Sequence, residues 1–585
     1  MTATEATPTT ADTGENNGGL SHRQIMTILS GLLLGMFLAA LDQTIVSTSI
    51  RTIGDDLNGL SAQAWVTTAF LIASTISTPL FGKLSDIYGR KPFFMLAITI
   101  FIAGSALCGL SQSMYELAGF RAFQGIGAGG IMPLALAIIG DIIPPRQRAK
   151  YQGYFMAVFA TSSVLGPVIG GFLAGQSSIL GVHGWRWIFY INVPIGIFAL
   201  FVVAKVLQVE HNRREHRIDW AGAAALAVTL VPLLIVAEQG RTWGFLSVSA
   251  FICYLIGVVG FVSFLLVERA MGDEALLPLR MFRNSVFAVG SGQSLLIGMG
   301  MFGGIASIPL YLQIVKGASP TKAGLLILPL VAALMVAGIL SGQFTARTGR
   351  YKPLPIAGSI LLVIGLFLMT GIAADTPLWQ ADLYMVVFGF GIGLNMQSIV
   401  LAMQNAVEPR DMGVATSSTT FFRQVGGSLG TAIFLSILFS QAGTNIGHQY
   451  AQARANGSFT AAAKAHPADA ASLKAHLSGS GGLNDTAFLQ KIDHALAHPF
   501  LVGFSDAMDR VFLVGAIVLV LAVVLSFMLK EIPLRNMSGQ QARAAADAAR
   551  SAHDGSQVPG QVAPTAATAP EPAGGSDQAS VSRVP

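Results

Sequence analysis

A chain of 585 residues in which 52% are hydrophobic and only 11% are charged lacks the charged surface that soluble domains need, because an ordinary soluble domain carries about 25% charged residues. The formal net charge is small, +5 from 35 basic and 30 acidic residues. These figures exclude a soluble multidomain enzyme and a nucleic-acid-binding protein, and they indicate a chain whose main solvent is lipid.

The chain begins with a polar segment, residues 1–24, for which we predict a disordered cytoplasmic tail and no cleavable signal. After it come fourteen apolar stretches, each close to the ~20 residues that a helix needs to cross a bilayer. They lie at 25–50, 62–82, 93–111, 117–140, 151–175, 185–206, 219–238, 245–268, 286–311, 322–345, 354–373, 381–403, 412–440 and 508–530.

An internal repeat organises these spans into two halves. FGKLSDIYGRKP follows the second span and SGQFTARTGRYKP follows the tenth, so that Gly82, Gly89 and Arg90 correspond to Gly342, Gly349 and Arg350, 260 residues apart. Pro145-Arg146 after the fourth span matches Pro409-Arg410 after the twelfth, 264 residues apart. Such duplicated helical halves are typical of secondary transporters, with the substrate site between the halves.

The repeat predicts an all-α integral membrane protein with about 14 transmembrane helices, in two pseudo-symmetric six-helix halves plus two linking helices. We place the first half at 25–206 and the linking helices with their loops at 207–284. The second half follows at 285–530 and includes a long outer loop, 441–507, with plausibly helical Ala-rich stretches and a flexible SGSGG segment. Residues 531–585 are predicted to be a disordered cytoplasmic tail.

The basic residues predict the orientation of the chain. If the N-terminus is cytoplasmic, most short-loop lysines and arginines fall in cytoplasmic loops, as positive loops stay inside. Since the spans are even in number, both termini are then cytoplasmic. The short outer loops hold only Arg51, Arg186, Arg241, Lys316 and Lys322.

Two ionisable residues lie inside confident spans at a similar depth. Asp42 is about two-thirds of the way across the first span, and Arg121 lies about one turn into the fourth span from the outer side. An unpaired charge there costs several kcal/mol, so each group must be neutralised, paired or hydrated. We expect the two to interact, directly or through water, and we expect Asp42 to couple protons to conformation. The alternative for Asp42 is a helix-boundary acid that faces the outer surface near Arg51.

Five motifs stand at defined places in the spans: LDQTIV in span 1, GKLSDIYGRK at 82–91, RAFQGIGAGG in span 4, LGPVIGG in span 5 and WRWIFYINVPIG at the start of span 6. Together they resemble the fourteen-span drug:proton antiporter family of the major facilitator superfamily. The resemblance runs from about residue 25 to 530. Ile87 departs from it, because family members often carry Arg there, and Ala346 stands in the second copy where the first has Asp86.

The resemblance implies roles for these residues. Asp42 and Arg121 would serve proton coupling, with Gln124 beside them. A cytoplasmic gating loop would contain Gly82, Asp86, Gly89, Arg90 and Lys91, although a plain positive-inside loop explains it as well. An antiporter motif would contain Gly166, Pro167, Gly170 and Gly171, for which ordinary glycine packing is the alternative. Independently of the resemblance, Arg423 and Gln424 in FFRQVGGSLG are the polar counterpart in the second half, and with Gln124 they are candidate cavity-lining residues; the alternative for Arg423 is helix packing alone.

Two enzyme motifs occur by chance. Gly125, Gly127 and Gly130 satisfy the dinucleotide pattern but lie inside an apolar helix, without the strand that a phosphate site needs. Gly426, Ser428 and Gly430 satisfy the hydrolase pattern, again without a strand. Neither predicts an enzyme.

We therefore expect no enzymatic activity, no cofactor and no metal, with the proton as coupling ion. The predicted function is multidrug efflux: alternating-access export of amphipathic or hydrophobic drugs or antibiotics, which would confer antibiotic resistance. The expected protein is multi-pass in the plasma (inner) membrane, surrounded by lipid, without nucleic acid and functional as a monomer. The alternatives are an exporter of a lipid or endogenous secondary metabolite and, less in keeping with the repeat, a membrane-embedded enzyme or a passive channel.

Overall fold

The computed structural model describes residues 22–57, 63–144, 147–207, 218–318, 320–408, 411–478, 489, 491–535 and 541. In these residues the secondary structure is helical apart from one isolated bridge between Ile179 and Val182. Thirteen described helices are long and apolar enough to cross a membrane, and a shorter apolar helix, Pro353–Met369, stands at the place of the eleventh expected span. The predicted fold class is confirmed.

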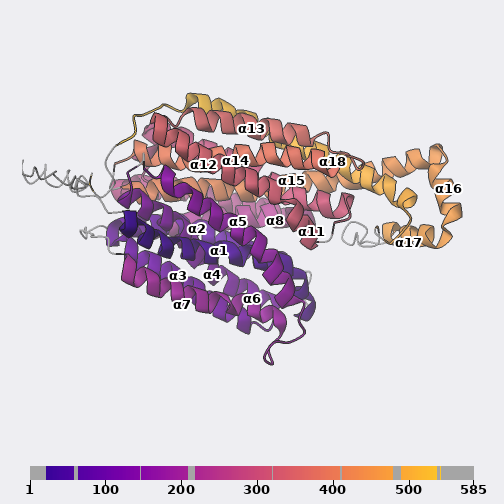
Figure 1. Ribbon diagram of the computed structural model, residues 1–585, viewed down its shortest axis with the longest axis horizontal. Coiled ribbons are helices and arrows are strands. Elements are labelled where there is room, and N and C mark those ends of the chain that lie inside the picture. Colours follow the sequence, from indigo (N-terminus) through magenta and orange to yellow (C-terminus); the bar gives the residue numbers. More distant parts are fainter. Residues whose placement is uncertain are drawn as a thin grey trace, which may run out of the picture. The chain divides into compact units, whose positions relative to one another are not determined.

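The helices follow the expected spans in order (Figure 1). The first six spans are α1 (His22–Asp56), α2 (Gln63–Tyr88), α3 (Arg90–Leu110), α4 (Met114–Ile142), α5 (Ala149–Ala174) and the series η2 (Gly184–Arg186), α6 (Trp187–Tyr190) and α7 (Asn192–Val206). The linking pair is α8 (Trp220–Trp243) and α9 (Val248–Met271), followed by η3 (Gly272–Glu274) and η4 (Leu279–Arg283). The last six spans comprise α10 (Ser285–Leu310) with η5 (Tyr311–Val315), α11 (Pro320–Leu326) with α12 (Leu328–Thr348), α13 (Pro353–Met369), α14 (Leu378–Ala406), α15 (Met412–Ala455) and α18 (His494–Met528).

The two halves repeat the same set of helix contacts. In the first half α1 packs against α5 and α7, α3 packs against α4 and α7, and α2 packs against α4. In the second half α10 packs against α15 and α18, α13 packs against α14 and α18, and α12 packs against α14. Between the halves α2 meets α15, and α5 meets α12. The pairs correspond one to one, as a duplicated unit requires.

Glycine contacts repeat at the spacing of the sequence repeat. A Cβ atom on Gly104 of α3 would lie 2.6 Å from the Cα of Gln124, and one on Gly365 of α13 would lie 2.8 Å from the Cα of Phe388. Gln124 and Phe388 are 264 residues apart, the spacing expected between spans 4 and 12. These close helix crossings need a residue without a side chain.

The linking pair lies along one seam between the halves. α8 and α9 pack against each other, and α8 also contacts α2 and α15. The turn after α9 is held by two buried carboxylates, because Asp219 accepts from the N–H of Leu276 at 3.3 Å and Glu268 accepts from the N–H of Leu277 at 3.0 Å. The linking helices are thus attached to both halves at the α2–α15 seam.

The expected outer loop, 441–507, is largely helical where it is described. α15 continues to Ala455 and α18 begins at His494, with α16 (Ser458–Ala465) and α17 (Pro467–Ser478) between them. The hydroxyl of Tyr450 donates to the carbonyl of Leu496 at 3.0 Å and ties the two extended helices together. Buried Leu473 and Phe500 add an apolar core, so the extension is packed rather than a loose loop. α16 and α17 mark this end of the bundle (Figure 1), and the opposite end is called the Asp86 end.

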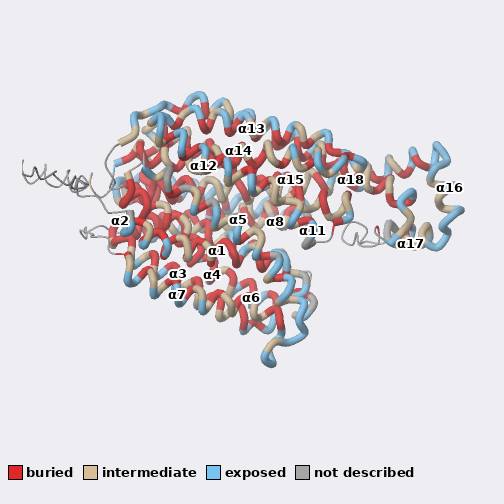
Figure 2. The backbone as a smooth tube through the Cα atoms, viewed as in Figure 1, coloured by how far each residue is buried: buried red, intermediate tan, exposed pale blue. Residues whose placement is uncertain are grey.

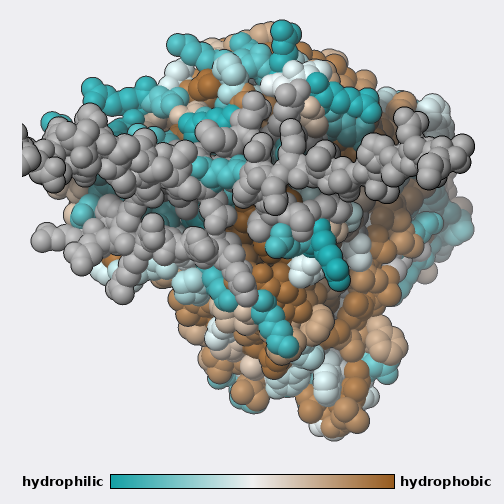
Figure 3. Space-filling model, turned by 60° about the vertical axis from the view of Figure 1, so that its left-hand side comes forward, coloured by the Kyte–Doolittle hydropathy of each residue, from teal (hydrophilic) through white to brown (hydrophobic). Residues whose placement is uncertain are grey.

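Burial separates the inside of the bundle from its lipid-facing surface. Buried positions run along the inner sides of the helices, and α16 and α17 are mostly exposed (Figure 2). α9 is apolar yet presents Phe251, Leu255, Val259 and Leu266 outward. Hydrophobic side chains cover much of the surface in Figure 3, interrupted by hydrophilic groups. An apolar exterior is what a lipid solvent selects.

Some sequence predictions lie outside the described residues. They are most of the two tails, residues 479–482 of the SGSGG segment, and the pairs Pro145-Arg146 and Pro409-Arg410 of the second repeat. The division of the chain at residues 206, 284 and 530 stays a prediction.

Candidate functional site

A buried ion pair joins α1 to α4. The Asp42 carboxylate lies 2.6 Å from Nη1 of Arg121, with 0% and 2% of the two side chains exposed. The guanidinium also stacks over the ring of Phe70 on α2, 4.0 Å from its centroid. A buried pair is strongly interdependent, since removal of one partner leaves an uncompensated charge that costs about 3–5 kcal/mol.

Two amides complete the surroundings of the carboxylate. Gln124 Nε2 donates to Asp42 Oδ1 at 3.0 Å, and Asn192 Nδ2 at the start of α7 donates to the same oxygen at 2.7 Å. Gln124 Oε1 in turn accepts from Arg121 at 2.7 Å, since residues three apart share a helix face. Ser105 Oγ on α3 accepts from both amides, at 2.6 and 3.2 Å. The resulting network spans α1, α3, α4 and α7.

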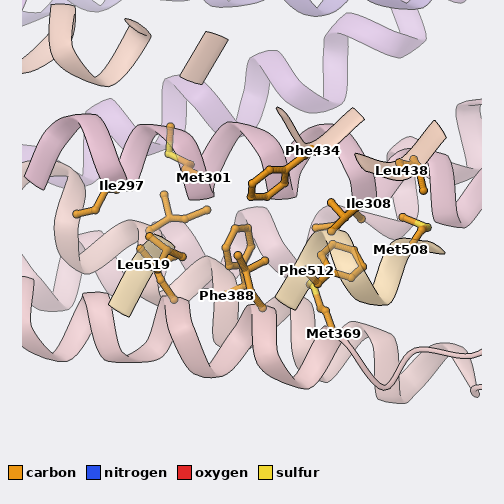
Figure 4. Close-up of a cluster of buried hydrophobic side chains, with 14 of the residues drawn as sticks. Ile297, Met301, Ile308, Met369, Phe388, Phe434, Leu438, Met508, Phe512 and Leu519 are labelled. Atoms are coloured by element: carbon orange, nitrogen blue, oxygen red, sulfur yellow. The ribbon is translucent and has the colours of Figure 1, made fainter. Parts of the chain in front are cut away.

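The described residues of the second half hold no such network at the equivalent place. The glycine contacts place Met385 and Phe388 of α14 where α4 carries Arg121 and Gln124. Both are buried and belong to one hydrophobic cluster. Figure 4 shows Ile297 and Phe388 among other apolar side chains. A titratable centre at this level is therefore built in the first half only, within the described residues.

The Gly82–Lys91 motif lies at the Asp86 end and is less of a loop than expected. Residues up to Tyr88 continue α2, and only Gly89, with φ 104°, separates it from α3. That dihedral angle favours glycine. A side chain on Gly82 would overlap Ser417 of α15, and Lys91 Nζ donates to the carbonyl of Ala204 at 2.6 Å.

Asp86 connects the two halves. Its carboxylate accepts from the backbone N–H groups of Gly413 and Val414, at 3.2 and 3.0 Å. These are the first residues of α15, where the free N–H groups and the helix dipole favour an anion. Arg90 lies 2.6 Å from Asp86 and 2.7 Å from Asp141 on α4, so the carboxylate is held from both sides.

The other seam is joined differently, because the second copy has Ala346 in place of the aspartate. Nη1 of Arg148 donates to Oε1 of Gln404 on α14, and its remaining nitrogens donate to the carbonyls of Ile143 and Gly140 at 2.9 and 2.8 Å. Burial lowers the pKa of Arg148 to about 10, so it is charged at neutral pH. Both seams between the halves are thus bridged at the Asp86 end.

The glycines of the span 5 motif have unequal surroundings. A Cβ on Gly166 would overlap Thr44 of α1, and one on Gly170 would lie 2.6 Å from Oγ1 of Thr48. A Cβ on Gly171 would meet nothing within 4 Å. Gly166 and Gly170 therefore set the approach of α5 to α1. The side chain of Pro167 lies outside the described residues.

Gln424 and Arg423 lie on different sides of α15. Gln424 Oε1 accepts from Thr78 Oγ1 of α2 at 3.4 Å, and it lines a pocket of about 100 Å³ at the seam covered by α8. The pocket is walled by apolar groups that include Leu234 and Phe302, with several hydroxyls. Arg423 is half-buried, and no described residue pairs with it or accepts a hydrogen bond from it.

Sequence reasoning missed four residues of these contacts. Asn192 stands in the span 6 motif but carries no charge to single it out; Asp141 lies just past the expected end of span 4. Arg148 resembles an ordinary positive loop residue, and Gln404 lies at a span end. Only the isolated amide of Asn192 in an apolar span could have pointed to a partner.

The described residues contain no group of three or more side chains suited to hold a metal ion.

Comparisons with known proteins agree on the type of chain. Residues 32–431 match the model of the Major Facilitator Superfamily. The chain is 33% identical to the multidrug transporter protein MdtP of Bacillus subtilis, over 88% of this chain and 94% of that protein. It is 37% identical to multidrug resistance protein 3 of the same species, over 70% and 78%. Among solved structures, a double-tryptophan mutant of XylE, a xylose transporter from E. coli, is similar with a TM-score of 0.56 and 16% identity, over 89% of this chain and 99% of that one.

Proposed function

Since the chain belongs to the major facilitator superfamily, we propose that it is a proton-coupled antiporter that exports amphipathic or hydrophobic drugs, antibiotics included, by alternating access. The observation that carries the proposal is the isolated ion pair of Asp42 and Arg121, buried within a polar network of the first half. The names of the Bacillus subtilis relatives support drug export as the purpose.

The pair gives protonation a mechanical effect. Ionised Asp42 neutralises Arg121 and accepts from Gln124 and Asn192, which holds α1, α4 and α7 together. Proton binding cancels the negative charge and leaves the guanidinium without its counter-charge in a dry site, which is costly. The first half therefore favours a different arrangement when protonated, and that change drives the exchange.

The contacts at the Asp86 end determine which state this geometry suits. We assign this end to the cytoplasm because basic loops stay inside. Both termini are then cytoplasmic. We propose further that the protein lies in the cell membrane and acts as a monomer. Asp86 with the start of α15, and Arg148 with Gln404, then hold the cytoplasmic side closed. Proton entry from outside would precede release of these bridges.

The testing experiment is proton-driven drug uptake into inverted membrane vesicles. With Asp42→Asn we expect at least a tenfold loss of uptake driven by a proton gradient, and no further loss on adding an uncoupler. Asp375→Asn is the matched control, because Asp375 is exposed and its one ion pair among the described residues is with His498 at 3.3 Å. Normal proton-driven uptake by the Asp42 variant contradicts the proposal.

A further inference from the structure

Arg423 is an arginine inside a membrane-spanning helix, and no described residue supplies a counter-charge to it. The other such arginine in the middle of a span, Arg121, has Asp42 at 2.6 Å. Within the described residues Arg423 has neither an ion pair nor a hydrogen bond. A guanidinium in hydrocarbon needs an anion, carbonyl groups or water, so the position calls for a partner that the described residues do not supply.

Arg423 lies on the face of α15 that packs inside the second half. Thr419 and Thr416, one and two turns nearer the Asp86 end, contact Met403 and Gln404 of α14. Arg423 continues that stripe by helical spacing, and Gly426 and Gly430 extend it against α10. A Cβ on Gly298 of α10 would overlap the carbonyl group of Arg423. Arg423 therefore lies where α15 meets α10 and α14.

The guanidinium is open to a ligand. No described residue accepts a hydrogen bond from its nitrogens, and none of these nitrogens is fully buried. They consequently reach accessible space. The next residue, Gln424, lines the pocket at the α8 seam, whose walls are mainly apolar and carry no charged side chain. One turn of α15 thus offers a positive charge beside an apolar recess.

We infer that Arg423 binds the anionic group of transported molecules, so that the cargo includes amphipathic anions with a carboxylate or sulfonate and an apolar body. The inference rests on the proposed export function. A guanidinium pairs with planar or tetrahedral oxyanions through parallel N–H donors. An anionic cargo also makes transport sensitive to the membrane potential. Export of an anion in exchange for any number of protons moves net positive charge inward.

The test compares two fluorescent probes with the same aromatic body. 1-Anilinonaphthalene-8-sulfonate is an anion and N-phenyl-1-naphthylamine is uncharged. Proton-driven transport of each is measured in proteoliposomes for wild type, Arg423→Gln, Arg423→Lys and the control Arg454→Gln, whose residue lies at the far end of the same helix against Phe459. Transport is repeated with an imposed inside-negative potential and no pH gradient.

We expect Arg423→Gln to lower kcat/KM for the sulfonate at least tenfold and for the uncharged probe less than twofold. Arg423→Lys should retain a substantial part of sulfonate transport, and Arg454→Gln all of it. The imposed potential should drive the sulfonate more strongly than the uncharged probe. Equal losses for both probes would mean a packing role, and an unchanged sulfonate rate would mean no role; either result overturns the inference.

Thermal unfolding separates the two proposals. The sulfonate probe should raise the unfolding temperature of wild type and not of Arg423→Gln, while the uncharged probe raises both, because a ligand stabilises only the form that binds it. If wild type exports neither probe, the proposed export function fails. The unfolding result then decides the anion site by itself.

Discussion

The carboxylate of Asp86 accepts a hydrogen bond from the backbone N–H of Val414 across the seam between the two halves, at a distance of 3.0 Å. A side chain of α2 thereby caps the first turn of α15, a helix of the other half that begins at Met412. In the proposed alternating-access function this contact would exist only while the Asp86 end is closed, and its strength would set part of the balance between the two access states.

Asp86→Asn should open the Asp86 end. The amide keeps one acceptor but loses the charge that the helix N-terminus and Arg90 favour, a loss of about 1–2 kcal/mol and hence roughly tenfold in the equilibrium. We expect a cysteine placed at Ser417, which is buried against Gly82, to react with a membrane-impermeant thiol reagent several times faster in this variant. The background has Cys108 and Cys253 replaced by serine.

Arg148→Gln should open the same end from the other seam. The substitution removes the guanidinium that reaches Gln404 and two carbonyl groups. Because this bridge and the Asp86 bridge share no residue, their effects should add in free energy. The reactivity of the cysteine at position 417 in the double variant should therefore equal the product of the two single increases. A double variant no more reactive than either single variant would mean that one bridge alone controls closure.

Asn192→Ala should weaken proton coupling without abolishing binding. A hydrogen bond to a charged group contributes about 1.5–3 kcal/mol, and Asn192 donates one to Asp42. We expect proton-driven export to fall about tenfold while substrate–substrate exchange stays within a factor of two. Gln293→Ala is the control, since Gln293 is a buried amide of the second half that donates to Ser526 at 2.6 Å. Equal losses in both variants would assign the effect to folding.

Gly166→Ala and Gly171→Ala should differ sharply. The added methyl group overlaps Thr44 at the first position and meets nothing within 4 Å at the second. Overpacking costs about 1–3 kcal/mol, so the first variant should lose thermal stability in detergent and most of its transport. The second should match wild type. A wild-type transport rate for Gly166→Ala would show that α1 and α5 need not approach so closely.

Hydropathy predicted the number and order of the spans, because lipid imposes the same length and apolarity on every crossing. The spacing of 264 residues between spans 4 and 12 reappears in the contacts of Gly104 and Gly365. Helix ends were less predictable. α15 continues to Ala455 because its extension packs on α18, and packing between distant segments leaves only a weak signal in the Ala-rich stretch itself.

The candidate site was half visible in the sequence. Charge in an apolar span singles out Asp42 and Arg121, since such charges are expensive. Asn192 and Asp141 were not singled out, because their importance comes from helix rotation and from partners on other helices. An uncharged amide is tolerated in a span for many reasons, so only the arrangement of the helices shows which partner it has.

Met385 and Phe388 stand at the places that Arg121 and Gln124 occupy in the first half. The two halves keep the same close helix crossings, but only the first half has a polar centre within the described residues, so the halves differ in function. Replacing α4 by α14 would preserve the glycine crossings but would place Met385 opposite Asp42 in the position of Arg121. Ancestry is recorded in the backbone approach of the helices, whereas specialisation is recorded in the side chains that fill the space between them.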